Sequence, residues 1–136
     1  MKKVFAVLIG LLLITFGSAA VWSYAKRVTD KGIAKFNDDT DNLLMGLQQY
    51  KEFFGTYPSG SSADISKAMF GQTEKKVLIL AVRRSDLNSK SEIIDPWGTP
   101  YQFYFSHNGI LIRSAGPNKA FEDSKTFSSD DLFRTN

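Results

Sequence analysis

An uncharged run from Val4 to Tyr24 constrains the fold of this chain more than any other feature of its sequence. Basic residues flank the run on both sides, with Lys2-Lys3 before it and Lys26-Arg27 after it. As a helix rising about 1.5 Å per residue, the run is roughly 30 Å long, which is enough to cross the hydrocarbon core of a bilayer. The chain therefore begins with a segment that suits a membrane or an export pathway.

Two interpretations of this segment remain open. It is either a retained anchor with Lys2-Lys3 in the cytoplasm, or a secretory signal that is cleaved after Ser18-Ala19-Ala20. No turn signal separates Ala25 from the helical pattern that follows, and this continuity favours the anchor. We therefore predict an N-terminal anchor or signal over residues 1–25 and one folded domain over residues 26–136.

A helical period follows the anchor. Apolar residues recur at steps of three and four at Ile33, Phe36, Leu43, Leu44, Leu47, Tyr50, Phe53 and Phe54. Gly55 is a suitable C-cap, and Tyr57-Pro58 prevents further helix. We predict a helix over residues 28–54. The residues expected to hold the rest of the domain on this helix are Phe36, Leu43, Leu47, Tyr50 and Phe54.

The middle of the chain, residues 59–92, reads as a variable loop with little regular structure. Asp64 to Phe70 fits one short helix closed by Gly71. Val77 to Val82 is a continuous apolar run that fits either a buried strand or a helical turn, and we predict a strand.

Residues 93–136 predict a sheet and a C-terminal loop. Asp95-Pro96-Trp97-Gly98 suits a type I turn. Aromatic and polar residues then alternate from Tyr101 to Ser106, as in a strand with one buried face. His107-Asn108-Gly109 is a strong hairpin signal, and the residues from Ile110 to Arg113 alternate on the return strand. The expected fold class is α+β, with a long N-terminal helix packed on a small antiparallel sheet.

The composition argues against an enzyme and against nucleic-acid binding. The chain has no Cys and a single His, His107, which lies in a turn without a partner for acid–base chemistry. No phosphate-binding glycine loop, catalytic triad or metal-spaced His set is present. Without Lys2-Lys3, 15 basic residues face 14 acidic ones, so no basic block remains for a nucleic acid.

The segment from Ser114 to Asp131 is rich in oxygen ligands. It contains Asn118, Glu122, Asp123, Ser124, Ser128, Ser129, Asp130 and Asp131. Ca²⁺ takes six to eight oxygen ligands and accepts irregular loops. An exposed polar tail would have a similar composition, so composition leaves both interpretations open.

Three motifs together resemble one family. They are Asp95-Pro96-Trp97-Gly98-Thr99-Pro100-Tyr101, Ser114-Ala115-Gly116-Pro117-Asn118 and Asp130-Asp131-Leu132. With the N-terminal helix, this layout resembles the major, G-type pseudopilin of type II secretion systems and its type IV pilin-like relatives. The resemblance implies a single-pass protein of the bacterial inner membrane with its head in the periplasm. It also implies assembly with other pseudopilins or secretion-apparatus subunits, as a homo- or hetero-oligomer.

The resemblance also implies a Ca²⁺ site in the C-terminal loop. In the G-type members, the ligands come from an acidic residue after the turn glycine and from an acidic pair near the end. Here Asn118, Asp130 and Asp131 hold those positions, and Ser128 and backbone carbonyls would complete the set.

The chain departs from the family pattern in two places. Gly10 is followed by Leu11-Leu12-Leu13-Ile14-Thr15, without the Glu that family members carry five residues into the mature helix and that is tied to processing and to subunit register. Asn118-Lys119 replaces the usual Asp-Gly, which removes one carboxylate. We therefore expect a divergent or accessory pseudopilin-like structural subunit. The alternative is a soluble, secreted periplasmic binding domain released by signal cleavage.

Overall fold

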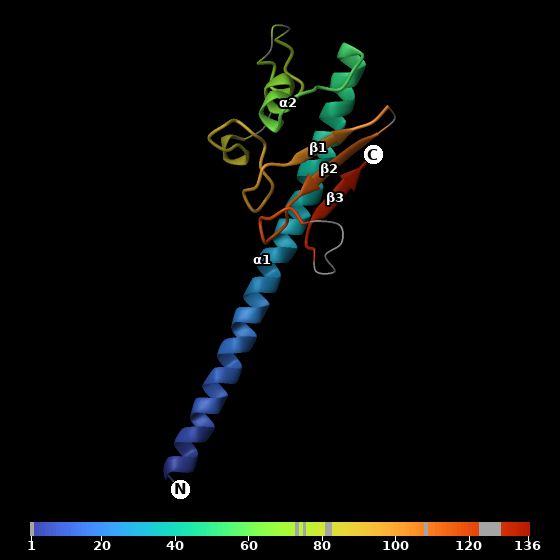
Figure 1. The fold of residues 1–136 in the computed structure, drawn as a ribbon. Coiled ribbons are helices and arrows are strands. Elements are labelled where there is room, and N and C mark those ends of the chain that lie inside the picture. The colour runs from blue at the N-terminus through green and yellow to red at the C-terminus, as the bar shows by residue number, and fades with distance from the viewer. Residues whose placement is uncertain (1, 73, 75, 81–82, 108, 123–128) are drawn as a thin grey trace. The chain divides into compact units, whose positions relative to one another are not determined.

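The computed structural model describes residues 2–72, 74, 76–80, 83–107, 109–122 and 129–136, and only the backbone of residues 2–20. Its helices are α1 (Lys2–Phe54), α2 (Ser62–Met69) and the short 3-10 helix η1 (Arg84–Asp86). Its strands are β1 (Gln102–Phe105), β2 (Ile110–Ser114) and β3 (Leu132–Thr135). The fold is α+β, a long N-terminal helix with a three-stranded antiparallel sheet, as predicted (Figure 1).

The chain divides into two compact units, Met1–Gly32 and Ile33–Asn136. The first unit is helical throughout its described part, and α1 continues without a break past Ala25. Val21, Trp22 and Tyr24 expose 70–72% of their surface. Within the part of the chain that the structure describes, we find no helix that is both long enough and apolar enough to cross a membrane.

In the second unit, α1 ends where the sequence predicts. Gly55 has φ 79°, a left-handed conformation that suits glycine, and its amide donates to the Lys51 carbonyl at 2.7 Å. The predicted short helix is also confirmed as α2. Ser61 and Asp64 form a capping box at its start, and Gly71 has φ 68° just past its end.

The sheet has the strand order β1-β2-β3, and both pairs are antiparallel. The predicted hairpin joins β1 to β2, with Phe105 opposite Ile110. Strand β3 was not predicted, and the expectation of a loop there is wrong for Leu132–Thr135. It pairs with β2 from Ser114↔Leu132 to Leu111↔Thr135. Arg134 in β3 also donates to Asp41 of α1, with Nε 3.0 Å from Oδ1.

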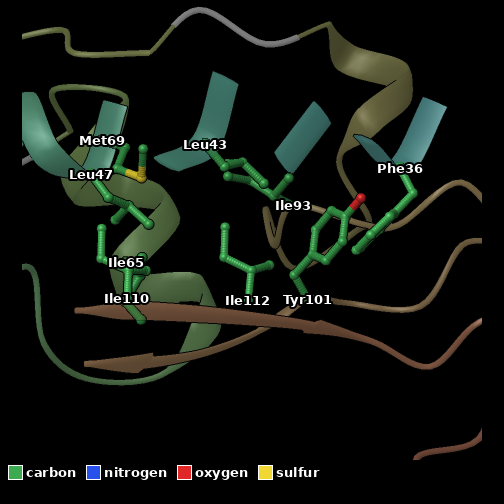
Figure 2. Packing of buried hydrophobic residues seen from close by; sticks show 9 residues of the cluster. All are labelled: Phe36, Leu43, Leu47, Ile65, Met69, Ile93, Tyr101, Ile110 and Ile112. Atoms are coloured by element: carbon green, nitrogen blue, oxygen red, sulfur yellow. The ribbon is translucent and has the colours of Figure 1, made fainter. Parts of the chain in front are cut away.

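One hydrophobic core joins α1, α2 and the sheet (Figure 2). Its buried residues are Phe36, Leu43 and Leu47 of α1, Ile65 and Met69 of α2, Ile93 and Tyr101 of the loops, and Ile110 and Ile112 of β2. In Figure 2 the side chains from the helix and from the strands face one another across this layer. The sheet is therefore held on the second half of α1 by direct apolar packing.

The buried face of α1 differs in part from the predicted stripe. Thr40 is fully buried between Phe36 and Leu43, and its hydroxyl donates to the Phe36 carbonyl at 2.7 Å. Tyr50 and Phe54 are only half-buried, with their ring centroids 4.4 Å apart. Phe53 is 71% exposed, because the side chains of adjacent helical positions such as Phe53 and Phe54 point in different directions.

The predicted strand from Val77 to Val82 is wrong for residues 77–80, and Val82 lies outside the described residues. The amides of Ile79 and Leu80 both donate to the Met69 carbonyl, at 2.9 and 3.0 Å. These amides therefore bond to the end of α2 instead of a neighbouring strand, while Leu80 packs against the core.

Candidate metal centre

The Asp95 turn is built around a buried carboxylate. Asp95 is 3% exposed, and its Oδ1 accepts hydrogen bonds from the amides of Trp97 and Thr99 at 3.0 and 2.8 Å. Its Oδ2 accepts from the Ser114 hydroxyl at 2.6 Å. Three donors therefore satisfy a carboxylate that would otherwise be costly to bury.

Ser114 extends this connection into the C-terminal loop. Its hydroxyl oxygen accepts from the Gly116 amide at 3.1 Å while its proton goes to Asp95. Two of the sequence motifs thus meet through one hydroxyl, at the end of β2. This contact fixes the direction in which the chain leaves the sheet.

Gly116 brings two parts of the loop into close contact. Its φ is 67°, and a Cβ at this position would overlap the backbone carbonyl of Asp130. The Asn118 amide donates to Asp130 Oδ2 at 3.0 Å on the same side of the loop. The turn after β2 is therefore packed directly against the segment that enters β3.

Three carboxylates gather where these segments meet. One oxygen from each of Glu122, Asp130 and Asp131 lies within 4.8 Å of the others. We call these three residues the carboxylate cluster. The Asp130 amide donates to Glu122 Oε2 at 3.2 Å, and the Glu122 amide donates to Asp131 Oδ2 at 3.3 Å. Two backbone amides of the cluster's own residues thus hold together carboxylates whose charges repel.

The cluster also contains buried oxygens that lack a donor. The Asp131 side chain is fully buried, yet its Oδ1 has no hydrogen-bond partner among the described residues. Asp130 Oδ1 is also buried without a hydrogen-bond partner among the described residues. A buried carboxylate oxygen without a donor is costly, and such oxygens are the ligands that Ca²⁺ prefers. The residues present therefore fit a calcium ion on this observation.

The ligand positions predicted from the sequence differ in their surroundings. Asp130 and Asp131 both belong to the carboxylate cluster. The Asn118 side chain is exposed and engaged, since Oδ1 accepts from the Ala120 amide at 2.8 Å and Nδ2 donates to Glu122 Oε1 at 3.0 Å. Asn118 thus positions Glu122, which supplies the third carboxylate. Ser128 lies outside the described residues.

Arg113 is a site residue that the sequence reading missed. Its Nε donates to Asp131 Oδ2 at 2.7 Å, and Nη2 donates to the same oxygen and to the Glu122 carbonyl. The hydrogen bond to Asp131 raises the pKa of Arg113. Because Arg113 lies opposite Phe133 of β3, its place in the site becomes visible only once that strand is known.

Two other features of the molecule carry polar or charged groups. His107 is exposed on the hairpin, and its backbone carbonyl accepts from Lys51 Nζ at 3.1 Å. A cleft of about 590 Å³ lies between α1 and the segment that contains η1, where Lys35 bridges Asp39 and Asp86 at 2.6 and 3.3 Å. Burial lowers the pKa of Lys35, but its two aspartate partners outweigh this effect and raise the pKa. The bridge makes the cleft a charged contact between two segments.

Comparisons of the chain with protein-family models, curated proteins and solved structures return no match.

Proposed function

We propose that this chain is a pseudopilin-like structural subunit of a type II secretion system or of a related type IV pilus-like apparatus. The observation that carries the proposal is the core shared by the second half of α1 and the antiparallel sheet. Phe36, Leu43 and Leu47 of the helix pack in the same cluster as Ile110 and Ile112 of β2. This is the arrangement of helix and head that the family resemblance implies.

In this proposal, residues 1–25 anchor the chain in the bacterial inner membrane and residues 26–136 lie in the periplasm. Val21, Trp22 and Tyr24 support the assembly role, since all three are large apolar residues with about 70% exposure. Exposed apolar residues that follow one another on a helix favour burial against lipid or against other helices. Other copies or other pseudopilins would supply those helices.

We propose further that Ca²⁺ stabilises the loop between β2 and β3. Glu122, Asp130 and Asp131 would hold the ion through their carboxylates, and Asn118 would keep Glu122 in position. When bound, the ion supplies positive charge and ligand bonds to oxygens that lack a donor. The role of the ion is structural, because it joins the two ends of the loop.

The first test is the intact mass and membrane partition of the protein expressed in its own host. A membrane-bound protein whose mass starts at or shortly after Met1 supports the assembly role. A soluble protein whose mass starts at Val21 contradicts it and favours the alternative, a secreted periplasmic binding domain.

A second test addresses assembly directly. The chain has no Cys, so an introduced cysteine reports a neighbouring copy without background. Val28→Cys lies on an exposed apolar position, and Asp30→Cys lies two positions along on another side of the same helix. Oxidation in membranes is expected to give more disulfide dimer at residue 28 than at residue 30. Monomer alone from both variants would argue against helix-mediated assembly.

A further inference from the structure

Arg113 is held against the carboxylate cluster from several directions. Its guanidinium lies over the ring of Phe121 at 5.1 Å and over the ring of Phe133 at 5.5 Å. Its hydrogen bonds reach Asp131 Oδ2 and the Glu122 carbonyl. The planar guanidinium of an arginine loses little conformational freedom when it stacks on aromatic rings and pairs with a carboxylate. Arg113 is therefore a fixed positive charge in this site.

The charges of this site do not balance. The carboxylate cluster carries three negative charges when ionised, and among the described residues hydrogen-bonded to it Arg113 is the one cationic side chain. Two negative charges therefore remain. Two of the three carboxylates in the cluster also have a buried oxygen without a donor, Asp130 Oδ1 and Asp131 Oδ1.

Arg113 has two opposing effects on a divalent ion at this place. It attracts the carboxylates and so keeps the loop closed when no ion is present. It also repels the ion, because two cations that share one carboxylate at short range raise each other's energy. The same guanidinium is thus expected to stabilise the ion-free loop and to weaken the binding of the ion.

We propose that Arg113 is a built-in counter-cation of the carboxylate cluster that sets the affinity of the loop for a divalent ion. This inference rests on the proposed calcium site and deepens it. Arg113 contacts the ligands and not the ion, so it acts as a positioning and affinity-setting residue. The residual charge of the site then matches one divalent ion.

The test compares Arg113→Gln with Arg113→Lys in the full chain, kept in detergent micelles at low salt. Gln keeps hydrogen-bonding capacity and loses the charge, whereas Lys keeps the charge and loses the bidentate geometry. Calorimetric titration with CaCl2 measures the Kd, and thermal unfolding in EDTA and in excess CaCl2 measures stability. Arg134→Gln is the matched control, because it removes the same charge from β3 at a pair with Asp41 that lies outside the cluster.

For Arg113→Gln, we expect Ca²⁺ binding about tenfold tighter than in the parent chain, since a repulsive unit charge is gone. We also expect Arg113→Gln to unfold at a lower temperature than the parent chain in EDTA. Excess CaCl2 should recover most of this loss. Arg113→Lys and Arg134→Gln should keep a Kd close to that of the parent chain. A purely structural role for Arg113 predicts the opposite, namely weaker binding and no recovery with CaCl2.

The possible failures are distinguishable. If the parent chain binds Ca²⁺ and Arg113→Gln does not bind it more tightly, the counter-cation role is overturned while the ion site stands. If only Arg113→Gln binds Ca²⁺, Arg113 is the resident cation, and the proposed ion site of the parent chain is overturned. If neither chain binds, both proposals fail.

Discussion

At the scale of single residues, the closed C-terminal loop depends most directly on Gly116. Its φ is 67°, and a methyl group there would overlap the backbone carbonyl of Asp130, which cannot move aside as the end of a flexible side chain could. We predict that Gly116→Ala lowers the free energy of unfolding by at least about 2 kcal/mol. Urea unfolding of the full chain measures this change.

Gly55→Ala is the matched control for that substitution. Gly55 has φ 79° at the end of α1, and nothing lies within 4 Å of a Cβ at this position. Gly55→Ala therefore introduces backbone strain without a steric clash, and we expect this strain to cost about 1 kcal/mol. Equal costs for the two variants would show that the contact between Gly116 and Asp130 contributes nothing.

The sequence predicted some site residues and missed others for identifiable reasons. Asp130 and Asp131 were predicted as ligands and lie in the carboxylate cluster. The family pattern predicts Asn118 as a ligand, but its side-chain amide is engaged with Ala120 and Glu122. A side chain four positions along the loop can replace a missing carboxylate, and no local signal reveals which one turns inward.

At the scale of elements, Leu47 tests the attachment of the sheet to α1. It is fully buried in the core that joins the two. Leu47→Ala should cost about 2–5 kcal/mol, because the cavity it leaves lies between elements that cannot collapse freely. Chemical unfolding measures the cost. Met45 lies on the same helix and is 63% exposed, so Met45→Ala should change the free energy of unfolding by less than about 0.5 kcal/mol.

The start of α2 makes stability depend on pH. The hydroxyl and the amide of Ser61 donate to Asp64 and lower the pKa of its carboxyl below the usual 3.8. The ionised form is therefore favoured by folding, and its contribution is present above pH 3.8 and lost as the pH falls through the lowered pKa. Thermal unfolding should show Asp64→Asn to be less stable than the parent chain at neutral pH.

That difference should shrink toward zero in acid. Ser61→Ala is the companion variant, because it removes the hydroxyl that lowers the pKa of Asp64. It should lose part of the same pH dependence. A gap between Asp64→Asn and the parent chain that stays constant down to acid pH would contradict the capping interaction.

Elements with local signals were predicted well. The end of α1 at Gly55, the helix α2 and the β1–β2 hairpin all follow from residues close together in the sequence. The strand β3 and the segment at residues 77–80 do not. Pairing of Leu132–Thr135 with β2 depends on a distant partner, and the apolar run at 77–80 is explained by its bonds to the end of α2.

At the scale of the whole molecule, the core residues belong to one unit. All nine buried members of the hydrophobic cluster lie between Phe36 and Ile112, inside the unit Ile33–Asn136. A chain that begins at Val21 should therefore unfold at nearly the same temperature as the full chain. Its circular dichroism should keep the aromatic bands and lose helical signal. A large fall in the unfolding midpoint would show that residues 1–20 stabilise the head.

The fold class could be predicted because the chain uses two distinct periods in two separate regions. A period near 3.6 fills the segment up to Phe54, and a period of two fills the region from Tyr101 to Arg113. The buried stripe of α1 was only partly predicted, since it includes Thr40, a polar residue that bonds to its own helix. Hydrophobic pattern alone cannot identify such a position.

The position of strand β3 also has a consequence for the order of folding steps. The β1–β2 hairpin pairs Phe105 with Ile110, so it can form locally within roughly 1–10 μs. Arg113 and Asp131 are 18 positions apart, and β3 can pair only after that longer loop closes. Strand β3 should therefore pair with β2 after the β1–β2 hairpin has formed. As an edge strand, it should also open more readily than the central strand, with its amides exchanging with solvent sooner than those of β2. Calcium bound to the loop would slow the exchange of β3 and leave that of α2 unchanged.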